Sequence, residues 1–319
     1  TGLMGGTGTY AFLIGAGKLT PDGFILAQFF MRDPGEEPAQ LLALEEFLAP
    51  CEAVVTYNGK AFDVPILNTR YITQGWLSPF LSLAHVDLLP LARKLWRDRL
   101  PSRTLGNIET SILGARRAAE DVPGWMIPQI FFDYLRDGDA RPLVGVFYHN
   151  AMDVVAMAAL LNHVTHLLAD PLQVSVENNV DLIGLGRFYE DLGRVDEAVD
   201  LYRRGLDQGL PEEVFWATLE RLSFIHKRAG VYEKAIHLWE QAAEHKHVFA
   251  HIELAKFYEH HARDVVAALT WTQSAIEVVS TYPYGIRQQW LGELEHRQAR
   301  LVRKRGNMPD EASSDPQDS

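Results

Sequence analysis

The feature that most constrains the fold of this chain is a repeated pattern of small and aromatic residues in its second half. Strand signals disappear after about residue 170, and three later segments carry matching side chains at matching positions. The first holds Leu182, Gly186, Tyr189, Ala198, Tyr202 and Gly205; the second Leu219, Ser223, His226, Ala235, Trp239 and Ala242; the third His251, Ala255, Tyr258, Ala267, Trp271 and Ser274. Small residues recur where paired helices approach closely, and large ones follow four positions later. The pattern predicts stacked helix pairs over residues 171–305.

The spacing of these copies brackets the roughly 34-residue period of tetratricopeptide repeats, which they resemble. The resemblance implies an all-α solenoid that binds a protein partner. Trp290–Arg303 is expected to form a terminal helix that covers the last apolar face, as solenoids require. Residues 306–319 are acidic and have no apolar periodicity, so we expect a disordered tail.

The first half predicts an α/β domain over residues 1–170. Tyr10–Ile14 and Phe24–Phe30 are expected to form an antiparallel strand pair, because Gly15, Gly17, Pro21 and Gly23 between them favour a turn. A helix is predicted over Ala39–Leu48, and Ala53–Tyr57 has the continuous β-rich composition of a buried strand. Helical patterns follow at Val64–Tyr71, Leu88–Trp96, Leu105–Leu113 and Gln129–Leu135, with a short strand near Val86.

Length and composition indicate the class of protein. A chain of 319 residues, 47% of them hydrophobic, is long enough for about two domains with their own cores. No continuous apolar run reaches the ~18 residues of a membrane span, and no signal-peptide pattern is present, so a cytoplasmic location without membrane contact is expected. The single Cys51 is interpreted as a packing residue. The chain begins with Thr1 rather than Met, which indicates that residues are missing upstream.

The charge distribution limits the kind of nucleic-acid binding that is possible. The net charge of −12 argues against a strongly cationic nucleic-acid binder. A local basic cluster is nevertheless present at Arg93, Lys94, Arg97, Arg99 and Arg103. Such a cluster either grips phosphate groups or is simply the solvated face of a helix.

Asp63 is the first candidate functional residue. It ends the segment Tyr57-Asn58-Gly59-Lys60-Ala61-Phe62-Asp63, at the point where a buried strand gives way to a helix. Ligands of open α/β sheets bind at the carboxyl ends of the strands, so Asp63 is expected to face a binding site. The alternative is that Asp63 only caps the following helix.

His149 and Asp153 form the second candidate pair. They are four residues apart, so in a helix they lie one turn apart on the same face, whereas Tyr148 points elsewhere. Asp153 precedes the apolar segment Val154–Leu168, where a carboxylate is costly unless it is paired or binds a metal. Taken alone, His149 has an alternative interpretation as a structural histidine.

These residues carry a resemblance to a known family. The segment Asn58–Asp63 resembles the second motif of DEDD exonucleases, Thr1-Gly2-Leu3 resembles the end of their first motif, and the stretch around Asp153 is similar to the third. The closest resemblance is to the YprB-like ribonuclease H-like proteins. It covers about residues 1–165, including His85–Leu89, Leu100–Glu109 and Asp121–Pro128.

The resemblance implies a ribonuclease H-like mixed sheet and a 3′–5′ exonuclease that acts on a single-stranded end of DNA or RNA. Four carboxylates would hold two Mg²⁺ or Mn²⁺ ions, hard cations that prefer oxygen ligands. Asp63 and Asp153 would supply two of these carboxylates. The other two would lie just upstream of Thr1, so the chain as given should bind metal poorly.

The resemblance also implies a general base. Family members that use Tyr place it four residues before the last Asp, and those that use His place it five before; here His149 is at four and Tyr148 at five. Helical geometry favours His149. Asn58, Lys60, Tyr148 and Thr1 are expected to contact substrate, while Asp87 is interpreted as a helix cap.

Two other functions are compatible with the sequence. One is an interaction protein whose nuclease-like domain is a non-catalytic scaffold. The other is a nucleic-acid-binding module without turnover.

Overall fold

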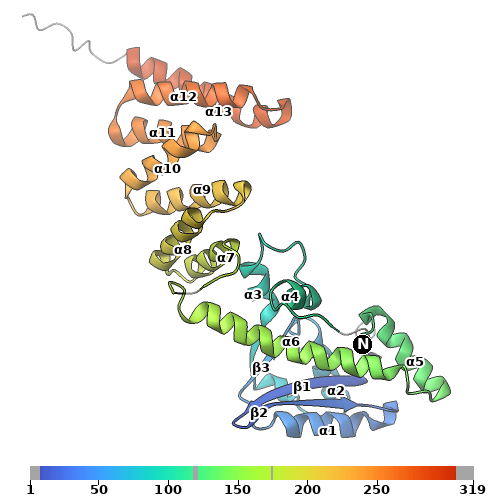
Figure 1. Ribbon diagram of the computed structural model, residues 1–319. Helices are drawn as coiled ribbons and strands as arrows, with labels where there is room; N and C mark the ends of the chain where they lie inside the picture. Colours follow the sequence, from blue (N-terminus) through green and yellow to red (C-terminus); the bar gives the residue numbers. More distant parts are fainter. Residues whose placement is uncertain (1–7, 118–120, 174, 307–319) are drawn as a thin grey trace, which may run out of the picture. The chain divides into compact units, whose positions relative to one another are not determined.

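The computed structural model describes residues 8–117, 121–173 and 175–306 (Figure 1). The chain divides into two compact units, residues 1–198 and 199–319. The sequence pattern places a domain boundary near residue 170, whereas the division between the units falls later, inside a helix. Thr1 and the acidic tail from residue 307 onward, both named in the sequence analysis, lie outside the described residues.

Unit 1 combines two small sheets with helices. Its main elements are β1 (Leu13–Thr20), β2 (Gly23–Phe30), α1 (Glu37–Leu48), β3 (Ala53–Thr56), α2 (Asp63–Thr73), β4 (Ala84–Asp87), α3 (Leu88–Leu95), α4 (Leu105–Ser111), α5 (Ile127–Asp137), α6 (Leu143–Ala169) and α7 (Val180–Asp191). β1 and β2 pair antiparallel, and β3 and β4 pair parallel. The predicted α/β class is present, but within the described residues the expected mixed sheet consists of two separate pairs.

The first strand lies later in the chain than the sequence predicted. β1 begins at Leu13 and includes Gly15 and Gly17, which had been assigned to the turn; the turn itself is Pro21 and Asp22. The glycines are there because α6 crosses the hairpin at close range. A Cβ at Gly15 would lie 2.4 Å from Oδ1 of Asn150. These glycines therefore permit close packing rather than a change of chain direction.

Helix α6 is the central helix of unit 1 and lies across β1 and β2 (Figure 1). Its Val154, Leu160 and Val164 are buried. By length and composition alone α6 is apolar enough to span a membrane. The helix is nevertheless interrupted by the polar residues His149, Asn150 and Asp153, so it contains no continuous apolar run of the length expected of a membrane span.

Two residues of the basic cluster of the first half, Lys94 and Arg99, pair with acidic residues of α7. Lys94 lies 2.7 Å from Asp191, and Arg99 lies 2.5 Å from Asp181. Helix α7 packs so closely on α3 that a Cβ at Gly184 would lie 1.9 Å from the carbonyl oxygen of Leu95. Lys94 and Arg99 therefore help to hold α7 against the rest of unit 1, a role that neither of the two interpretations of the cluster included.

Unit 2 is helical throughout its described residues. It contains the end of α8 (Val195–Gln208), then α9 (Glu212–Arg228), α10 (Tyr232–Glu244), α11 (Val248–Phe257), a π-helical turn η4 (Tyr258–Ala262), α12 (Val265–Ser280) and α13 (Tyr284–Gly306). Residues that recur in the sequence pattern form its core; Ala235 and Trp239 are fully buried, and Nε1 of Trp239 donates to Oγ of Ser223 at 2.9 Å.

The third copy of the pattern is shifted by one residue. The fully buried pair is Ala268 and Thr272, not the predicted Ala267 and Trp271, which are half-buried. The preceding turn η4 explains the shift, because a π-helix accommodates one more residue per turn than an α-helix.

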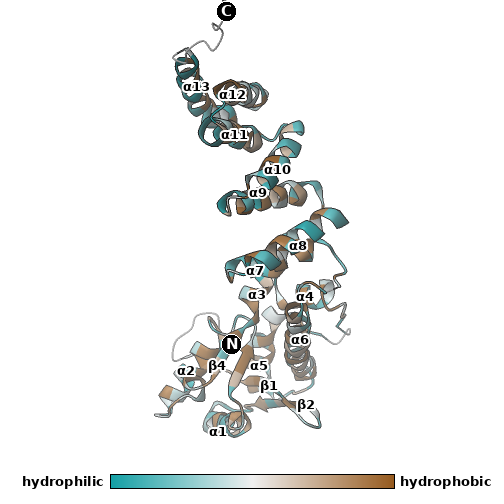
Figure 2. Ribbon diagram, turned by 90° about the vertical axis from the view of Figure 1, so that its left-hand side faces the viewer, coloured by the Kyte–Doolittle hydropathy of each residue, from teal (hydrophilic) through white to brown (hydrophobic). Residues whose placement is uncertain are grey.

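Helix α13 covers the last helix pair. Its Leu294 is buried against α11 and α12, and Leu301 is buried against the start of α12. Figure 2 shows α13 as mainly hydrophilic beside a largely hydrophobic α12. This is the predicted covering helix, although it begins at Tyr284 rather than Trp290.

Candidate active site

The carboxyl ends of β3 and β4 bring together two loops that were distant in sequence. Because the strands are parallel, Thr56 pairs with Asp87 at the same edge. The Asp87 carboxylate accepts backbone hydrogen bonds from Asn58 (2.7 Å), Lys60 (3.1 Å) and Leu89 (3.1 Å). Asp87 thus caps α3, as predicted, and also fixes the loop that leads to Asp63.

The loop between β3 and α2 has a backbone that constrains its residues. Asn58 is left-handed (φ 64°), a conformation that Asn tolerates better than most residues. Its carbonyl accepts from the backbone N–H groups of Ala61 and Phe62, both at 3.2 Å. A side chain at the buried Gly59 would collide with Thr56. The Asn-Gly pair is therefore required by the turn, and the exposed Lys60 projects from it.

Asp63 is the first residue of α2 and follows Phe62, which occupies the N-cap position. Asp63 therefore stands one position inside the helix rather than at its N-cap position. Although the side chain has substantial solvent exposure, burial raises the pKa of Asp63, and the negative charges of Asp87 and Asp153 raise it further. Asp63 and Asp153 thus lie close enough to repel one another.

His149 and Asp153 share one face of α6, as helical geometry predicted. Nε2 of His149 lies 3.5 Å from Oδ2 of Asp153, while Nδ1 lies 2.7 Å from Oδ1 of Asp121. On the hairpin side, Gln28 of β2 donates to the side chain of the neighbouring Asn150 at 2.9 Å. The motif is thereby anchored to the sheet. Tyr148 is half-buried on the same helix.

Arg117 links the carboxylates of this region. Its guanidinium lies 2.6 Å from Glu109, 2.5 Å from Asp153 and 3.5 Å from Asp121. Glu109 is almost completely buried. Burial lowers the pKa of Arg117, but hydrogen bonds to Glu109 and Asp153 outweigh this and raise it overall. The result is a permanent positive charge among acidic residues.

The structure therefore adds three residues to those singled out from the sequence. Arg117, Glu109 and Asp121 all contact the His149–Asp153 pair directly or through one another. Glu109 and Asp121 had appeared only within stretches of family resemblance. Arg117 had no signal, because its partners Glu109 and Asp153 lie on two different helices. The side chain of Lys60 is exposed and has no hydrogen bond or ion pair with this network in the described part of the chain, and Thr1 lies outside the described residues.

The donor chemistry suits a hard cation only in part. Asp63 and Asp153 offer oxygen ligands, and their mutual repulsion would be relieved by a divalent ion between them. Within the described ranges, however, no group of three or more His, Cys, Asp or Glu side chains is arranged to hold a metal. The two carboxylates fit such an ion in type and charge, and further ligands would be required.

Comparison with known proteins identifies the family. Residues 1–165 match the RNase H superfamily. The chain belongs to this superfamily. It is also 30% identical over 311 residues to YprB of Bacillus subtilis (strain 168), an uncharacterized protein; the match covers 95% of this chain and 73% of the relative. No solved structure matches the chain.

Proposed function

We propose that this protein is a metal-dependent nuclease that hydrolyses phosphodiester bonds, with 3′–5′ exonuclease polarity. The observation that carries the proposal is the His149–Asp153 pair on α6, with the Asp63 carboxylate in electrostatic contact with Asp153, in a member of the RNase H superfamily. That superfamily consists generally of hydrolytic nucleases, which supports the nuclease class. The polarity and the number of ions are inferred from the resemblance of the motifs to DEDD exonucleases.

His149 is proposed to act as the general base. The contact of Nδ1 with Asp121 (2.7 Å) is shorter than its contact with Arg117 (3.1 Å), so Nδ1–H donating to Asp121 is the favoured tautomer. Nε2 is then unprotonated and free to take a proton from water. Asp121 orients the ring, and the bond from Gln28 to Asn150 holds this part of α6 against β2.

Asp63 and Asp153 are proposed to be the metal ligands present in this chain. When bound, Mg²⁺ or Mn²⁺ would activate water and stabilise the leaving oxygen. The resemblance to DEDD exonucleases implies two further ligands, an Asp and a Glu, that are not among the described residues. Asn58 fixes the loop through its backbone, and the exposed Lys60 is proposed to meet a substrate phosphate.

The experiment is a cleavage assay with the full-length protein. Single-stranded DNA and RNA, each labelled at the 5′ or the 3′ end, are incubated with Mn²⁺ or Mg²⁺. Successive shortening of the 5′-labelled strand, with immediate release of a labelled mononucleotide from the 3′-labelled strand, is the expected result. Asp63→Asn and Asp153→Asn should each abolish it.

The matched control is Asp22→Asn, which removes one negative charge from an exposed turn. It should cleave like the unmodified protein. Cleavage that survives both active-site substitutions would refute the ligand assignment, and internal cuts without end-dependent shortening would refute the exonuclease polarity.

A second candidate function is a non-catalytic scaffold or nucleic-acid-binding protein with a partner bound by the helical region. The specific observation in its favour is that Arg117 already neutralises Asp153. Tight oligonucleotide binding without cleavage, unchanged by Mn²⁺, would favour it. For the helical region, the recurrence of buried small and aromatic residues supports a tetratricopeptide-like role in protein binding.

A further inference from the structure

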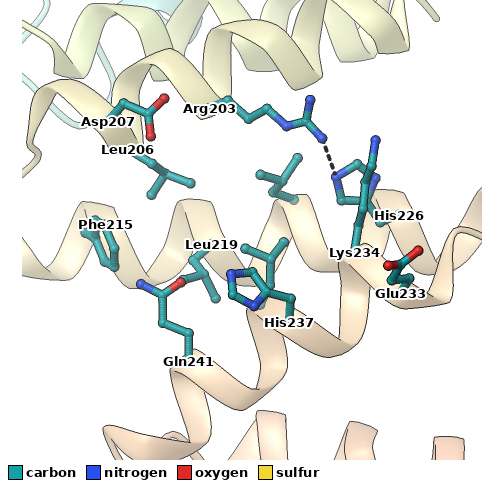
Figure 3. Close-up of a pocket in the computed structure, with 12 residues that line it drawn as sticks. Arg203, Leu206, Asp207, Phe215, Leu219, His226, Glu233, Lys234, His237 and Gln241 are labelled. Carbon is teal, nitrogen blue, oxygen red and sulfur yellow. Dashed lines mark hydrogen bonds between the residues drawn. The ribbon is translucent and has the colours of Figure 1, made fainter.

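A cavity of about 580 Å³ lies among the helices of unit 2 (Figure 3). It is bounded by α8, α9 and α10. Its apolar wall includes Leu206, Phe215 and the deeply buried Leu219 and Leu222. This volume falls within the range of ligand sites, roughly 300–1,000 Å³. The cavity is far in sequence from the candidate active site.

One end of the cavity gathers groups that prefer an anion. Figure 3 shows Arg203, His226 and Lys234 converging there from three different helices. The Arg203 guanidinium lies 3.5 Å from Nε2 of His226, whose side chain is 7% exposed. Burial lowers the pKa of His226, and the positive charges of Arg203 and Lys234 lower it further.

These cations have no counterion in the described part of unit 2. No ion pair of Arg203 or Lys234 with a carboxylate is formed there, whereas Lys227 and Lys256 nearby both pair with Glu253. Two free cations beside a buried, polar imidazole form a site in which one anionic group would gain charge-assisted hydrogen bonds. The adjoining leucine wall would hold an apolar group next to that anion.

We propose that this cavity binds a partner polypeptide through a carboxylate at Arg203, Lys234 and His226 and a neighbouring apolar side chain on the leucine wall. The proposal gives a chemistry to the partner suggested for the helical region and does not depend on nuclease activity. The carboxylate accepts from Arg203 and Lys234, and the imidazole of His226 can donate to it once protonated.

The remaining charges in the cavity favour a peptide over a nucleic acid. Glu233, beside Lys234, and Asp207, at the opposite end, also line it, so the cavity is not basic throughout (Figure 3). A nucleic-acid strand would bring a phosphate every few ångströms and needs a continuous basic track. A peptide with a single carboxylate beside apolar residues would meet the cations at one end and avoid Asp207 at the other (Figure 3).

The test uses the full chain and two acetylated, amidated tripeptides that differ by one charge, Leu-Leu-Asp and Leu-Leu-Asn. Binding is followed by the NMR signals of the His226 ring during titration. We expect Leu-Leu-Asp to shift these signals and to raise the pKa of His226, because an anion offsets Arg203 and Lys234. Glu233 and His237 also line the cavity and are not substituted in any of the variants.

Leu-Leu-Asn should bind at least about tenfold more weakly. Gly-Gly-Asp should be similarly weak if the leucine wall contributes. Arg203→Gln and Lys234→Gln should each weaken Leu-Leu-Asp about tenfold, while Lys304→Gln, an equal charge change on exposed α13, should have no effect.

Equal binding of the Asp and Asn peptides would overturn the proposal. The proposal also fails if the His226 signals do not shift at a peptide concentration about 20-fold above a dissociation constant of about 1 mM. Tighter, Arg203-dependent binding of a ten-nucleotide single strand would overturn it too and would identify the cavity as a nucleic-acid site. None of these results bears on cleavage by the Asp63 and Asp153 region, so the two proposals fail separately.

Discussion

A guanidinium nitrogen of Arg117 lies 2.5 Å from Oδ1 of Asp153, on the face of α6 that also presents His149. The same guanidinium holds the buried Glu109. The side chain of Arg117 thus neutralises Asp153, a carboxylate that we propose as a metal ligand. A divalent ion at Asp153 would compete with this contact.

Arg117→Met should therefore have two opposite effects. The free energy of unfolding should fall by roughly 3–5 kcal/mol, because Glu109 is left buried without a partner. Mn²⁺ affinity of the folded full-length protein, measured by electron paramagnetic resonance, should increase several-fold. The double substitution Glu109→Gln with Arg117→Met should recover much of the stability. Weaker Mn²⁺ binding in both variants would show that Arg117 supports the site instead of competing with it.

Asp63→Asn should stabilise the metal-free protein in a pH-dependent way. The pKa of Asp63 is raised in the folded protein, so protonation of Asp63 contributes to the stability of the fold. This contribution is fully present below the unfolded-state pKa of ~3.9 and is lost as the pH rises through the folded-state pKa. The melting temperature of Asp63→Asn minus that of the unmodified protein should thus grow from pH 4 to pH 7. Scanning calorimetry without metal measures it. A difference in melting temperature that does not change with pH, as expected for Asp22→Asn, would contradict the raised pKa of Asp63.

The assignment of the base is tested by two adjacent substitutions. His149→Gln should lower the cleavage rate by about 10²–10⁴, the usual contribution of general base catalysis. Tyr148→Phe should leave it within about threefold. The rates of both variants and of the unmodified protein are compared under the same conditions with the same labelled strand. The reverse ranking of the two variants would assign the base to Tyr148.

A buried ion pair away from the site offers a test of stability alone. Arg70 on α2 and Glu37 on α1 pair at 2.5 Å with both side chains at most 5% exposed. Glu37→Gln should cost roughly 3–5 kcal/mol of unfolding free energy, because the buried guanidinium of Arg70 loses its charged partner. Urea unfolding measures this loss. Cleavage by the fraction that remains folded should be unchanged; a selective loss of activity would link this pair to the site.

The close packing of α7 on α3 predicts a strong effect from a single methyl group. Gly184→Ala would place Cβ 1.9 Å from the Leu95 carbonyl oxygen, a backbone atom that has little freedom to move. We expect a destabilisation of at least about 1–3 kcal/mol. Gly292→Ala, on the exposed side of α13 with no atom nearby, should instead stabilise its helix by up to ~1 kcal/mol. Similar effects at both positions would refute the packing argument.

Local patterns in the sequence were sufficient for some of these features. The four-residue spacing of His149 and Asp153 places them on one helical face whatever else the domain does, and the strand-to-helix junction places Asp63 at a sheet edge. Both inferences use only neighbours in sequence. The role of Asp87 as a cap was accessible for the same reason.

Features that depend on distant contacts could not be obtained in this way. Gly15 was assigned to a turn because the reason for a glycine there, Asn150 on α6, is remote in sequence. The basic residues around Arg99 suggested phosphate binding because their acidic partners lie on α7. Arg117 carried no local pattern at all. In each case the partner that decides the role is brought near only by the tertiary fold.

The π-helical turn at Tyr258–Ala262 also bears on how relatives of this chain can differ in length. A residue inserted into a regular helix rotates every later side chain by about 100° relative to its neighbours. Here the extra residue is confined to one wide turn, and Ala268 and Thr272 still reach the core. In an alignment, relatives that lack the insertion should therefore show a one-residue gap within this turn. The buried small and large positions of α12 should align without a shift after that gap.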